Sequence, residues 1–426
     1  MKRANGEGTV YYNEARKRFE GQVSYTNKTT GELKRKFFSS IKSAAAVRKK
    51  MKEFSNLISK GVDIDKNKQP MGEWLEYWLN NFKKHQIRAK TFERYGVSLR
   101  CHINPYIGNK LMNEITSEML QEHLLMLIEE LELAPRTVNS VRRLLIQALN
   151  EAVDLGYMEK NPALKTKAIK TTKPIINVLT KEEAMRLINA ARAHSMNSWI
   201  IIILALGTGM RIGEIFALSK KNIDLFNKKL YVEESAVKMN NGILLQREVK
   251  TVNSRREISL PDFVVAALQK YFQFLKSFAL ENAGHYTDKG YIIVNQFGNV
   301  RHPASFSYHT FKKKLLPAAM ISSKFRFHDL RHTHATWLLN AGVNVKVVSE
   351  RLGHANVRIT LETYAHVIKT MQESAVQKLD LLYNNLSTDT IDNKVIDAEY
   401  CEERGQATGQ AITEKSITKY ETITRF

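Results

Sequence analysis

The chain has 426 residues, long for a single core, so we expect about two or three domains. Its 65 Lys and Arg outnumber 43 Asp and Glu, a formal net charge of +22, which favours a polyanionic partner, nucleic acid before an anionic membrane. No apolar run approaches the roughly 18 residues that span a bilayer, the N-terminus shows no secretory signal, and Cys101 and Cys401 are too far apart to indicate a disulfide framework or a thiolate zinc site, so we expect a cytoplasmic protein without membrane contact.

Residues 1–60 carry 15 Lys or Arg against 5 acidic residues. Alternating runs predict strands at 9–12, 19–25 and 34–38, and a helix from Ser43 to about Leu57 that covers the sheet. We expect a basic sheet face that enters a DNA groove, the alternative being a solvated domain whose charges aid solubility. The residues expected on that face are Tyr11, Arg16, Lys17, Arg18, Tyr25, Lys34, Arg35 and Lys36.

After a polar linker at 61–70, helical spacing predicts a bundle of about four helices over 71–162, with a basic linker following. Thr91 is predicted to cap the second helix, Asn104 and Pro105 with Gly108 to end it, and Thr116 and Pro135 to open the next two. Basic residues at helix starts suit phosphate contacts, although a solvated helix face is as good an interpretation of any one of them. These candidates are Lys90, Thr91, Arg136, Thr137, Arg142 and Arg143.

The third region opens with a capping box, Thr180 to Glu183. An apolar helix at 199–206 runs into a glycine turn that places Arg211 at the start of the next helix, a good anion site, although pairing with Glu214 is an equal alternative. Runs at 229–237, 243–250 and 255–260 predict one small antiparallel sheet, with Lys250 at its last turn. Helices are predicted from Pro261 to about 278 and over 304–316.

Residues 327–367 concentrate polar side chains, and Gly342 and Gly353 divide them into three short helices. His328 and His332, spaced i, i+4, resemble a zinc pair, but Arg331 would place a cation beside the metal, so we expect no metal there. We interpret His332 and His334 as packing or hydrogen-bonded residues.

One set of side chains fits a single reaction. Two guanidiniums can clamp a phosphodiester, a phenol can attack phosphorus, and lysine or imidazole can move protons. No Asp and Glu cluster fit for magnesium is visible, so the hypothesis is metal-free phosphoryl transfer. The set is Arg211, Lys250, His328, Arg331, His354 and Tyr364.

At these residues the sequence resembles the tyrosine recombinases, specifically phage and conjugative-transposon integrases. The matching blocks are TGMRIGE at 208–214, VKTVNSRREISLP at 249–261, HDLRHTHAT at 328–336 and LGHANVRITLETYAHV at 352–367. The resemblance implies an arm-type DNA-binding domain at 1–60, a helical core-binding domain at 71–165, a mixed α/β catalytic domain at 175–385 and a polar tail at 386–426. The fold class is multidomain, mainly α, with small antiparallel sheets.

The resemblance also implies the residue roles. Arg211 and Arg331 stabilise the pentacoordinate phosphate, and His354 binds one of its oxygens. Lys250 protonates the departing 5′-hydroxyl, His328 handles the tyrosine proton, and Tyr364 forms a 3′-phosphotyrosine without cofactor. The implied partners are double-stranded DNA attachment sites, a homo-tetramer on DNA, and an excisionase or host DNA-bending protein as helper.

The predicted function is integration and excision of a mobile element by site-specific recombination. A chromosome-dimer resolvase is the first alternative, and residues 1–60 argue against it because resolvases lack an arm-binding domain. A DNA-binding regulator without catalysis is another alternative, and the complete six-residue set argues against it. A zinc hydrolase is the third, and activity that persists in a strong chelator would remove it.

Overall fold

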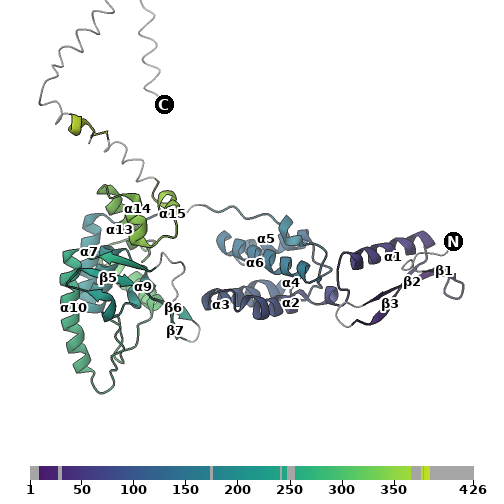
Figure 1. Cartoon of the computed structure of the whole chain (residues 1–426), viewed down its shortest axis with the longest axis horizontal. Helices are drawn as coiled ribbons and strands as arrows, with labels where there is room; N and C mark the ends of the chain where they lie inside the picture. Colours follow the sequence, from purple (N-terminus) through teal and green to yellow (C-terminus); the bar gives the residue numbers. More distant parts are fainter. Residues whose placement is uncertain are drawn as a thin grey trace, which may run out of the picture.

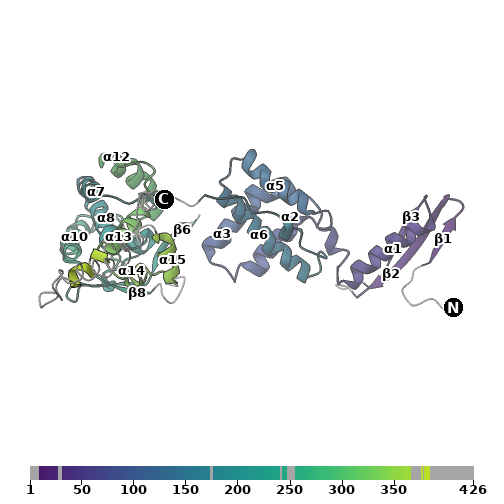
Figure 2. The ribbon, with the colours of Figure 1, turned by 90° about the horizontal axis from the view of Figure 1, so that it is seen from above.

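A computed structural model of the chain describes residues 9–26, 31–172, 176–239, 242–246, 255–365, 376–377 and 379–383. The predicted Lys250 and the tail at 386–426 lie outside these residues. Three bodies follow one another along the long axis (Figure 1), and the view from above keeps the same order (Figure 2). We name them the N-terminal unit (9–64), the helical bundle (65–165) and the C-terminal body (177–365).

The N-terminal unit is a three-stranded antiparallel sheet in the order β1-β2-β3, covered by one helix, as predicted. Its elements are β1 (Val10–Asn13), β2 (Arg18–Thr26), β3 (Leu33–Ser40) and α1 (Ala44–Ser59). Ser43 caps α1, because its hydroxyl accepts the Ala46 amide. Apolar side chains of α1 and the central strand form the core: Val23, Val47, Met51 and Phe54.

The prediction of one basic sheet face is wrong in part, because strand side chains alternate between faces. Lys34 and Lys36 lie on the helix-covered face, where Lys34 pairs with Asp65 at 2.7 Å and Lys36 lies 4.5 Å from the centre of the Phe54 ring. Tyr25 is on that face too, against Phe54. The open face carries Tyr11, Arg18 and Arg35, with Phe37 exposed beside them.

The helical bundle contains α2 (Met71–Trp78), η2 (Leu79–Lys83), α3 (Ala89–Ser98), η3 (Leu99–Ile103), α4 (Asn104–Ile107), α5 (Ser117–Glu129) and α6 (Pro135–Asp154), with short turns η1 (Lys66–Lys68) and η4 (Pro162–Lys165). Thr116 caps α5 and Pro135 opens α6, as predicted. Two details are wrong. Arg88 precedes α3, so Thr91 lies inside the helix and caps nothing. Helical backbone also continues through Pro105 to Ile107, because a proline near the start of a new helical turn lacks only an amide with no partner there.

The C-terminal body contains α7 (Lys181–His194), α8 (Met196–Thr208), α9 (Ile212–Phe216), η5 (Lys220–Asn222), α10 (Asp262–Glu281), α11 (Pro303–Ser305), η7 (Phe306–Leu315), α12 (Leu316–Ala318), α13 (Asp329–Asn340), α14 (Val345–Leu352) and α15 (Val357–Thr363). The capping box from Thr180 to Glu183 and the three helices of 327–367 are as predicted.

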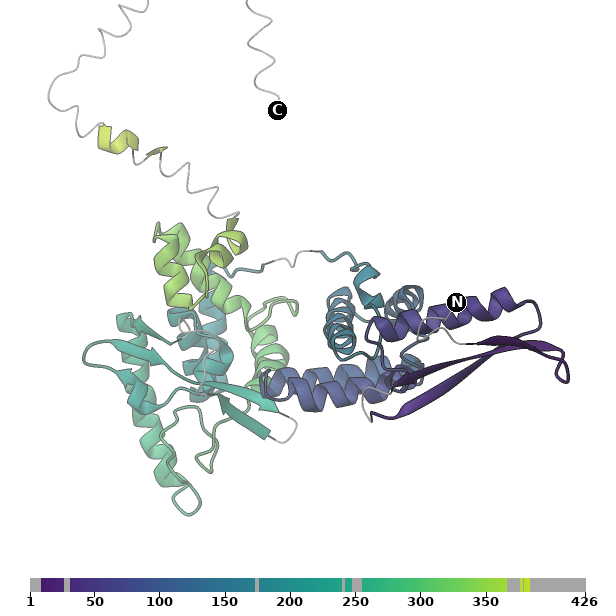
Figure 3. The ribbon, with the colours of Figure 1, turned by 45° about the vertical axis from the view of Figure 1, so that its right-hand side comes forward.

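The prediction of one sheet in this body is wrong. The strands form two antiparallel sheets, β4-β5-β8 and β6-β7, because the first predicted run divides between Val232 and Ser235. Their bounds are β4 (Ile223–Asp224), β5 (Lys229–Val232), β6 (Ser235–Met239), β7 (Gly242–Gln246) and β8 (Arg256–Ser259). The β6-β7 hairpin projects from the body (Figure 3), and β6 contacts α3 of the bundle.

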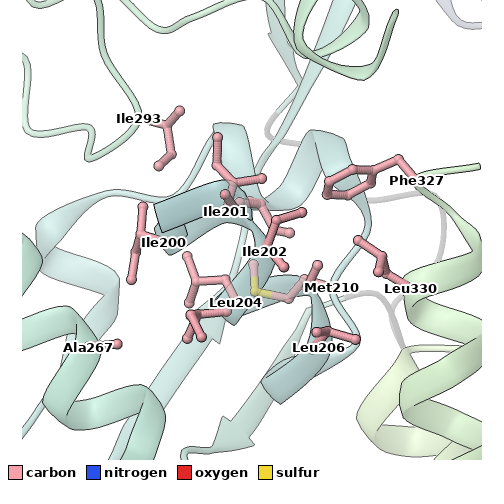
Figure 4. Packing of buried hydrophobic residues seen from close by; sticks show 14 of the residues in the cluster. Ile200, Ile201, Ile202, Leu204, Leu206, Met210, Ala267, Ile293, Phe327 and Leu330 are labelled. Atoms are coloured by element: carbon pink, nitrogen blue, oxygen red, sulfur yellow. The ribbon is translucent and has the colours of Figure 1, made fainter. Parts of the chain in front are cut away.

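Helix α8 is the centre of the C-terminal core. All residues from Ile200 to Thr208 are buried, and their side chains meet Ala267 of α10, Ile293, and Phe327 and Leu330 near the start of α13 (Figure 4). A helix buried all round is held on every side, so its C-terminal end is fixed against α13. No helix among the described residues is long and apolar enough to cross a membrane.

Candidate active site

The turn between α8 and α9 positions the first part of the site. Gly209 ends α8 with a positive φ of 68°, a conformation that favours glycine. Its carbonyl oxygen accepts a hydrogen bond from Arg331 Nη1 at 2.9 Å. A Cβ on Gly209 would lie 2.6 Å from His334 Cδ2, so space as well as backbone requires glycine here.

Arg211 stands at the N-terminus of α9 and is paired with Glu214, so both interpretations of Arg211 describe part of the structure. Its Nη1 donates to Glu214 Oε1 at 2.8 Å and its backbone amide to Oε2 at 2.9 Å. Arg256 of β8 donates to the same carboxylate, Nη2 to Oε2 at 2.8 Å. Burial would raise the pKa of Glu214, but Arg256 and Arg211 hold it at about 2. The carboxylate therefore stays ionised and orients two guanidiniums.

Arg331 is almost completely buried, only 3% exposed. Two backbone carbonyls hold it, Gly209 through Nη1 at 2.9 Å and Leu352 through Nη2 at 2.6 Å. These carbonyls end α8 and α14, so the guanidinium joins three helices. They use only part of its N–H donors, which leaves capacity for phosphate oxygens.

His354 follows α14, where Gly353 ends the helix with a φ of 66°. Its Nδ1 lies 2.7 Å from the hydroxyl oxygen of Thr360, which is fully buried. Burial lowers the pKa of His354 to about 3, and the charges of Arg331 and Arg211 add to the effect. The imidazole is therefore neutral at neutral pH and can offer one N–H to an anion.

Tyr364 is the residue after α15 and is 1% exposed. Its ring packs with Ala335, Leu339, Val348 and Leu352 of α13 and α14. Its hydroxyl oxygen lies 2.8 Å from Nδ1 of His332. Burial raises the pKa of Tyr364 to about 12, although Arg331 opposes this shift.

His328 precedes α13, and its ring meets the ring of His332 edge to face at 5.0 Å. Burial lowers the pKa of His328 to about 4, helped by the neighbouring His332 and Arg331. His334, in contrast, is occupied on both ring nitrogens. Nδ1 lies 2.6 Å from the Leu206 carbonyl oxygen, and Arg351 Nε donates to Nε2 at 3.1 Å.

The structure thus brings together Arg211 from the start of α9, Arg331 from α13, and His354 and Tyr364 from the residues that follow α14 and α15, with His328 beside them. Lys250 lies outside the described residues. No group of three or more His, Cys, Asp or Glu able to hold a metal occurs in the described part of the chain. The His328 and His332 rings pack on each other.

Sequence reasoning missed Arg256 and Thr360. It interpreted His332 and His334 as packing or hydrogen-bonded residues, which is confirmed, but it did not identify Tyr364 as the partner of His332. Arg256 lies in the quoted block at 249–261, but a strand arginine gives no sign of its carboxylate partner. The i, i+4 spacing of His328 and His332 suggested a metal pair, although it also places both imidazoles on the helix face towards Tyr364. Thr360 carried no signal.

Several predicted DNA contacts are engaged within the chain. Arg142 donates to the Thr166 carbonyl and hydroxyl oxygens, between 2.6 and 3.1 Å. Lys90 pairs with Glu93, and Arg143 donates to Ser140. Arg136 and Thr137 are exposed in the first turn of α6. Arg142 thus fixes the linker after the bundle.

Two oriented guanidiniums, neutral imidazoles and a phenol around one point fit the class of enzymes that transfer a phosphoryl group to their own tyrosine. Comparisons with known proteins agree. Residues 177–371 match the phage integrase family, and residues 71–125 match its N-terminal SAM-like domain. The chain belongs to the phage integrase family of tyrosine recombinases.

Among relatives, a tyrosine recombinase XerC-like protein of Caldanaerobacter subterraneus is 28% identical over 88% of this chain and 99% of its own length. The integrase of Staphylococcus phage L54a is 27% identical over 73% of this chain and 92% of its own. The chain is accordingly a site-specific recombinase of the integrase type that cuts and rejoins DNA.

Solved structures show the same fold. The Tn1549 transposon integrase in complex with transposon right-end DNA matches with a TM-score of 0.62 and 20% identity, covering 73% of this chain and 100% of that one. A lambda integrase tetramer bound to a Holliday junction matches with a TM-score of 0.52 and 18% identity, covering 82% and 95%.

Proposed function

We propose that the chain integrates and excises a mobile element without metal, by transferring a DNA phosphate to Tyr364. The position of the Tyr364 hydroxyl supports this most directly. It lies 2.8 Å from His332 Nδ1, and the charge of the buried Arg331 lowers the pKa of the phenol. A purely structural tyrosine would not need an imidazole nitrogen at its hydroxyl and a buried guanidinium close by.

The reaction follows from these groups. The Tyr364 oxygen attacks phosphorus, its O–H proton goes to an imidazole, and the bond from phosphorus to the 5′ oxygen breaks. Arg211, Arg331 and His354 donate to the non-bridging oxygens, whose charge increases in the transition state. The product is a 3′-phosphotyrosine and a free 5′-hydroxyl. The reverse reaction with another 5′-hydroxyl rejoins DNA, so no external energy source is needed.

Lys250 is the proposed acid for the departing 5′ oxygen. It follows β7 and precedes β8, on the segment that leads to Arg256. A substrate with sulfur in place of that bridging oxygen has a better leaving group and needs no acid. We expect Lys250→Ala to cleave ordinary DNA slowly and the sulfur substrate at close to the wild-type rate. Equal impairment on both substrates would remove Lys250 from this role.

All three bodies contribute to the proposed DNA binding. The N-terminal unit binds arm-type sites, and the bundle and C-terminal body enclose the core site, with β6 of the C-terminal body contacting α3 of the bundle. We propose a homo-tetramer on DNA by analogy with the lambda integrase tetramer, and an excisionase or a host DNA-bending protein as helper. Four of the predicted DNA-contact residues are exposed and make no side-chain hydrogen bond or ion pair with the described residues. They are Lys17, Arg35, Arg136 and Thr137.

A strand-exchange assay in EDTA tests this function. A duplex core site, selected by binding from a random library, carries the recombination target. We expect recombinant products and a covalent protein–DNA intermediate whose yield is unchanged by the chelator. Activity that disappears in EDTA and returns with a divalent cation would contradict the metal-free mechanism, and binding without any strand cleavage would indicate a regulator.

A resolvase function is the second candidate, because the relative named XerC-like matches 99% of its own length. The two functions differ in their use of residues 1–60. Removing these residues should abolish integration at sites with arm sequences. A resolvase acting on core sites alone would keep its activity after this truncation.

A further inference from the structure

The hydrogen bond between His332 and Tyr364 assigns a role that the family pattern gives to a different residue. His332 Nδ1 is 2.8 Å from the Tyr364 hydroxyl oxygen, and the two ring centres are 5.8 Å apart. His328 makes no such bond to Tyr364 among the described contacts, and reaches it only through the ring of His332. We propose that His332 both positions the nucleophile and accepts its proton during DNA cleavage, an inference that rests on the proposed function.

The position of His332 is fixed by α13. It directly follows Arg331, whose two carbonyl bonds hold that turn of the helix. It lies four residues after His328, whose ring supports its own from the side. Tyr364 is held independently by its apolar packing with α13 and α14. Both partners of the hydrogen bond are therefore preorganised.

The protonation states of the two side chains allow this proton transfer. Burial lowers the pKa of His332, so its ring is neutral, and burial raises the pKa of Tyr364, so the phenol keeps its proton. The phenol then donates to Nδ1, and the ring proton sits on Nε2. As the oxygen bonds to phosphorus, the O–H proton passes to Nδ1 and the 5′ oxygen leaves with a proton from Lys250. Rejoining returns both protons.

The charges around His332 influence the pH range in which its ring is neutral and can accept the tyrosine proton. From its own helix Asp329 favours the imidazolium, while Arg331 and the preceding Arg326 oppose it. Tyr364, which follows α15, and His328 face it as neutral groups. The rate of cleavage should therefore increase with pH up to neutral as His332 loses its proton. The titration of His332 itself should produce this acid limb of the pH profile.

Single-turnover cleavage of a nicked duplex separates the alternatives. His332→Asn retains an acceptor near the Nδ1 position but cannot take a proton, and His332→Gln is the second variant. We expect cleavage about 10² to 10⁴ times slower than wild type in both, with the acid limb of the pH profile lost. Core-site binding and melting temperature should stay unchanged. His309→Asn, an exposed histidine, is the matched control.

The sulfur substrate adds a readout that a packing role would not give. It relieves the need for an acid at the 5′ oxygen but not for a base at the tyrosine. Lys250→Ala should therefore be rescued and His332→Asn should not. A His332→Asn variant that cleaves at the wild-type rate or faster, or one rescued by sulfur, overturns the inference while leaving Tyr364 as nucleophile. Wild-type protein that forms no covalent adduct would instead overturn the proposed function.

Discussion

Charged side chains are used in different ways at the two ends of the molecule. In the N-terminal unit Arg16 and Arg18 reach Glu20 on the sheet, where the Arg16 side chain is largely exposed and the Arg18 side chain is half-buried. In the C-terminal body Arg331 and the Glu214–Arg256 pair are buried and bonded to backbone carbonyls or to each other. Water and salt weaken the first kind of contact, whereas burial strengthens the second and fixes its geometry. Exposed charged side chains suit DNA binding, and buried, fixed guanidiniums suit stabilisation of a transition state.

Among the substitutions that test the difference between exposed and buried charges, Arg331→Lys should have the largest effect. A lysine keeps the charge but cannot bond the Gly209 and Leu352 carbonyls as a planar guanidinium does. We expect cleavage in a single turnover to fall by about 10² to 10³, with core-site binding nearly unchanged. Arg358→Lys, whose guanidinium is exposed and pairs with Glu362, is the control and should cleave normally. A small effect at Arg331 would show that charge alone, without fixed geometry, suffices.

Glu214→Gln tests how much the buried Glu214–Arg256 pair contributes to the free energy of unfolding. Its folded pKa of about 2 lies below its ordinary 4.5, so ionised Glu214 contributes stability that is complete above pH 4.5 and lost as pH falls towards 2. The variant should lower the free energy of unfolding by about 3 kcal/mol at neutral pH. In urea unfolding the difference from wild type should shrink on acidification. Glu257→Gln, an exposed partner of Lys229, should cost under about 1 kcal/mol; an equal cost at both would remove the distinction between the two kinds of pair.

Gly209→Ala tests the turn that carries Arg331. Its φ of 68° and the predicted contact with His334 should lower stability by about 2 kcal/mol and reduce cleavage along with it. Gly284→Ala is the control, because a Cβ there meets nothing within 4 Å. A Gly209→Ala protein with wild-type melting temperature and activity would show that the turn tolerates a side chain.

The smallest expected effect is a difference in DNA binding between variants on the two faces of the N-terminal sheet. Arg35 lies on the open face and Lys34 pairs with Asp65 on the other. Arg35→Ala should weaken binding to arm-type DNA several-fold and reduce the salt dependence of log K by about one phosphate contact. Lys34→Ala should change either quantity much less. Equal losses would indicate that net charge, not the face, determines binding.

Sequence patterns predicted the parts of this fold that depend on local chemistry. The helix start at Thr116, the Thr180 capping box and the glycine joints of 327–367 all follow from side chains within a few residues. The parts that failed depend on partners distant in sequence. Lys34 and Arg35 are adjacent on β3 and therefore point to opposite faces, but the packing of α1 on the sheet decides which of these faces is covered.

The site shows the same division. Motif resemblance identified Arg211, Arg331, His354 and Tyr364, which the structure brings together. The sequence offered the pairing of Arg211 with Glu214 as an alternative, but gave no sign that Arg256 would share this carboxylate or that Thr360 would orient His354. The contact of His332 with Tyr364 spans 32 residues and requires the folded order of α13 to α15. No local pattern contains that information.

Covalent trapping tests the central claim that Tyr364 is the nucleophile. A suicide duplex, nicked so that the cleaved 5′ end diffuses away, is incubated with wild type, Tyr364→Phe and Tyr308→Phe, whose tyrosine is exposed on η7. We predict a protein–DNA adduct with wild type and Tyr308→Phe, joined to the peptide that contains residue 364, and none with Tyr364→Phe. An adduct formed by Tyr364→Phe at the wild-type rate would contradict the account.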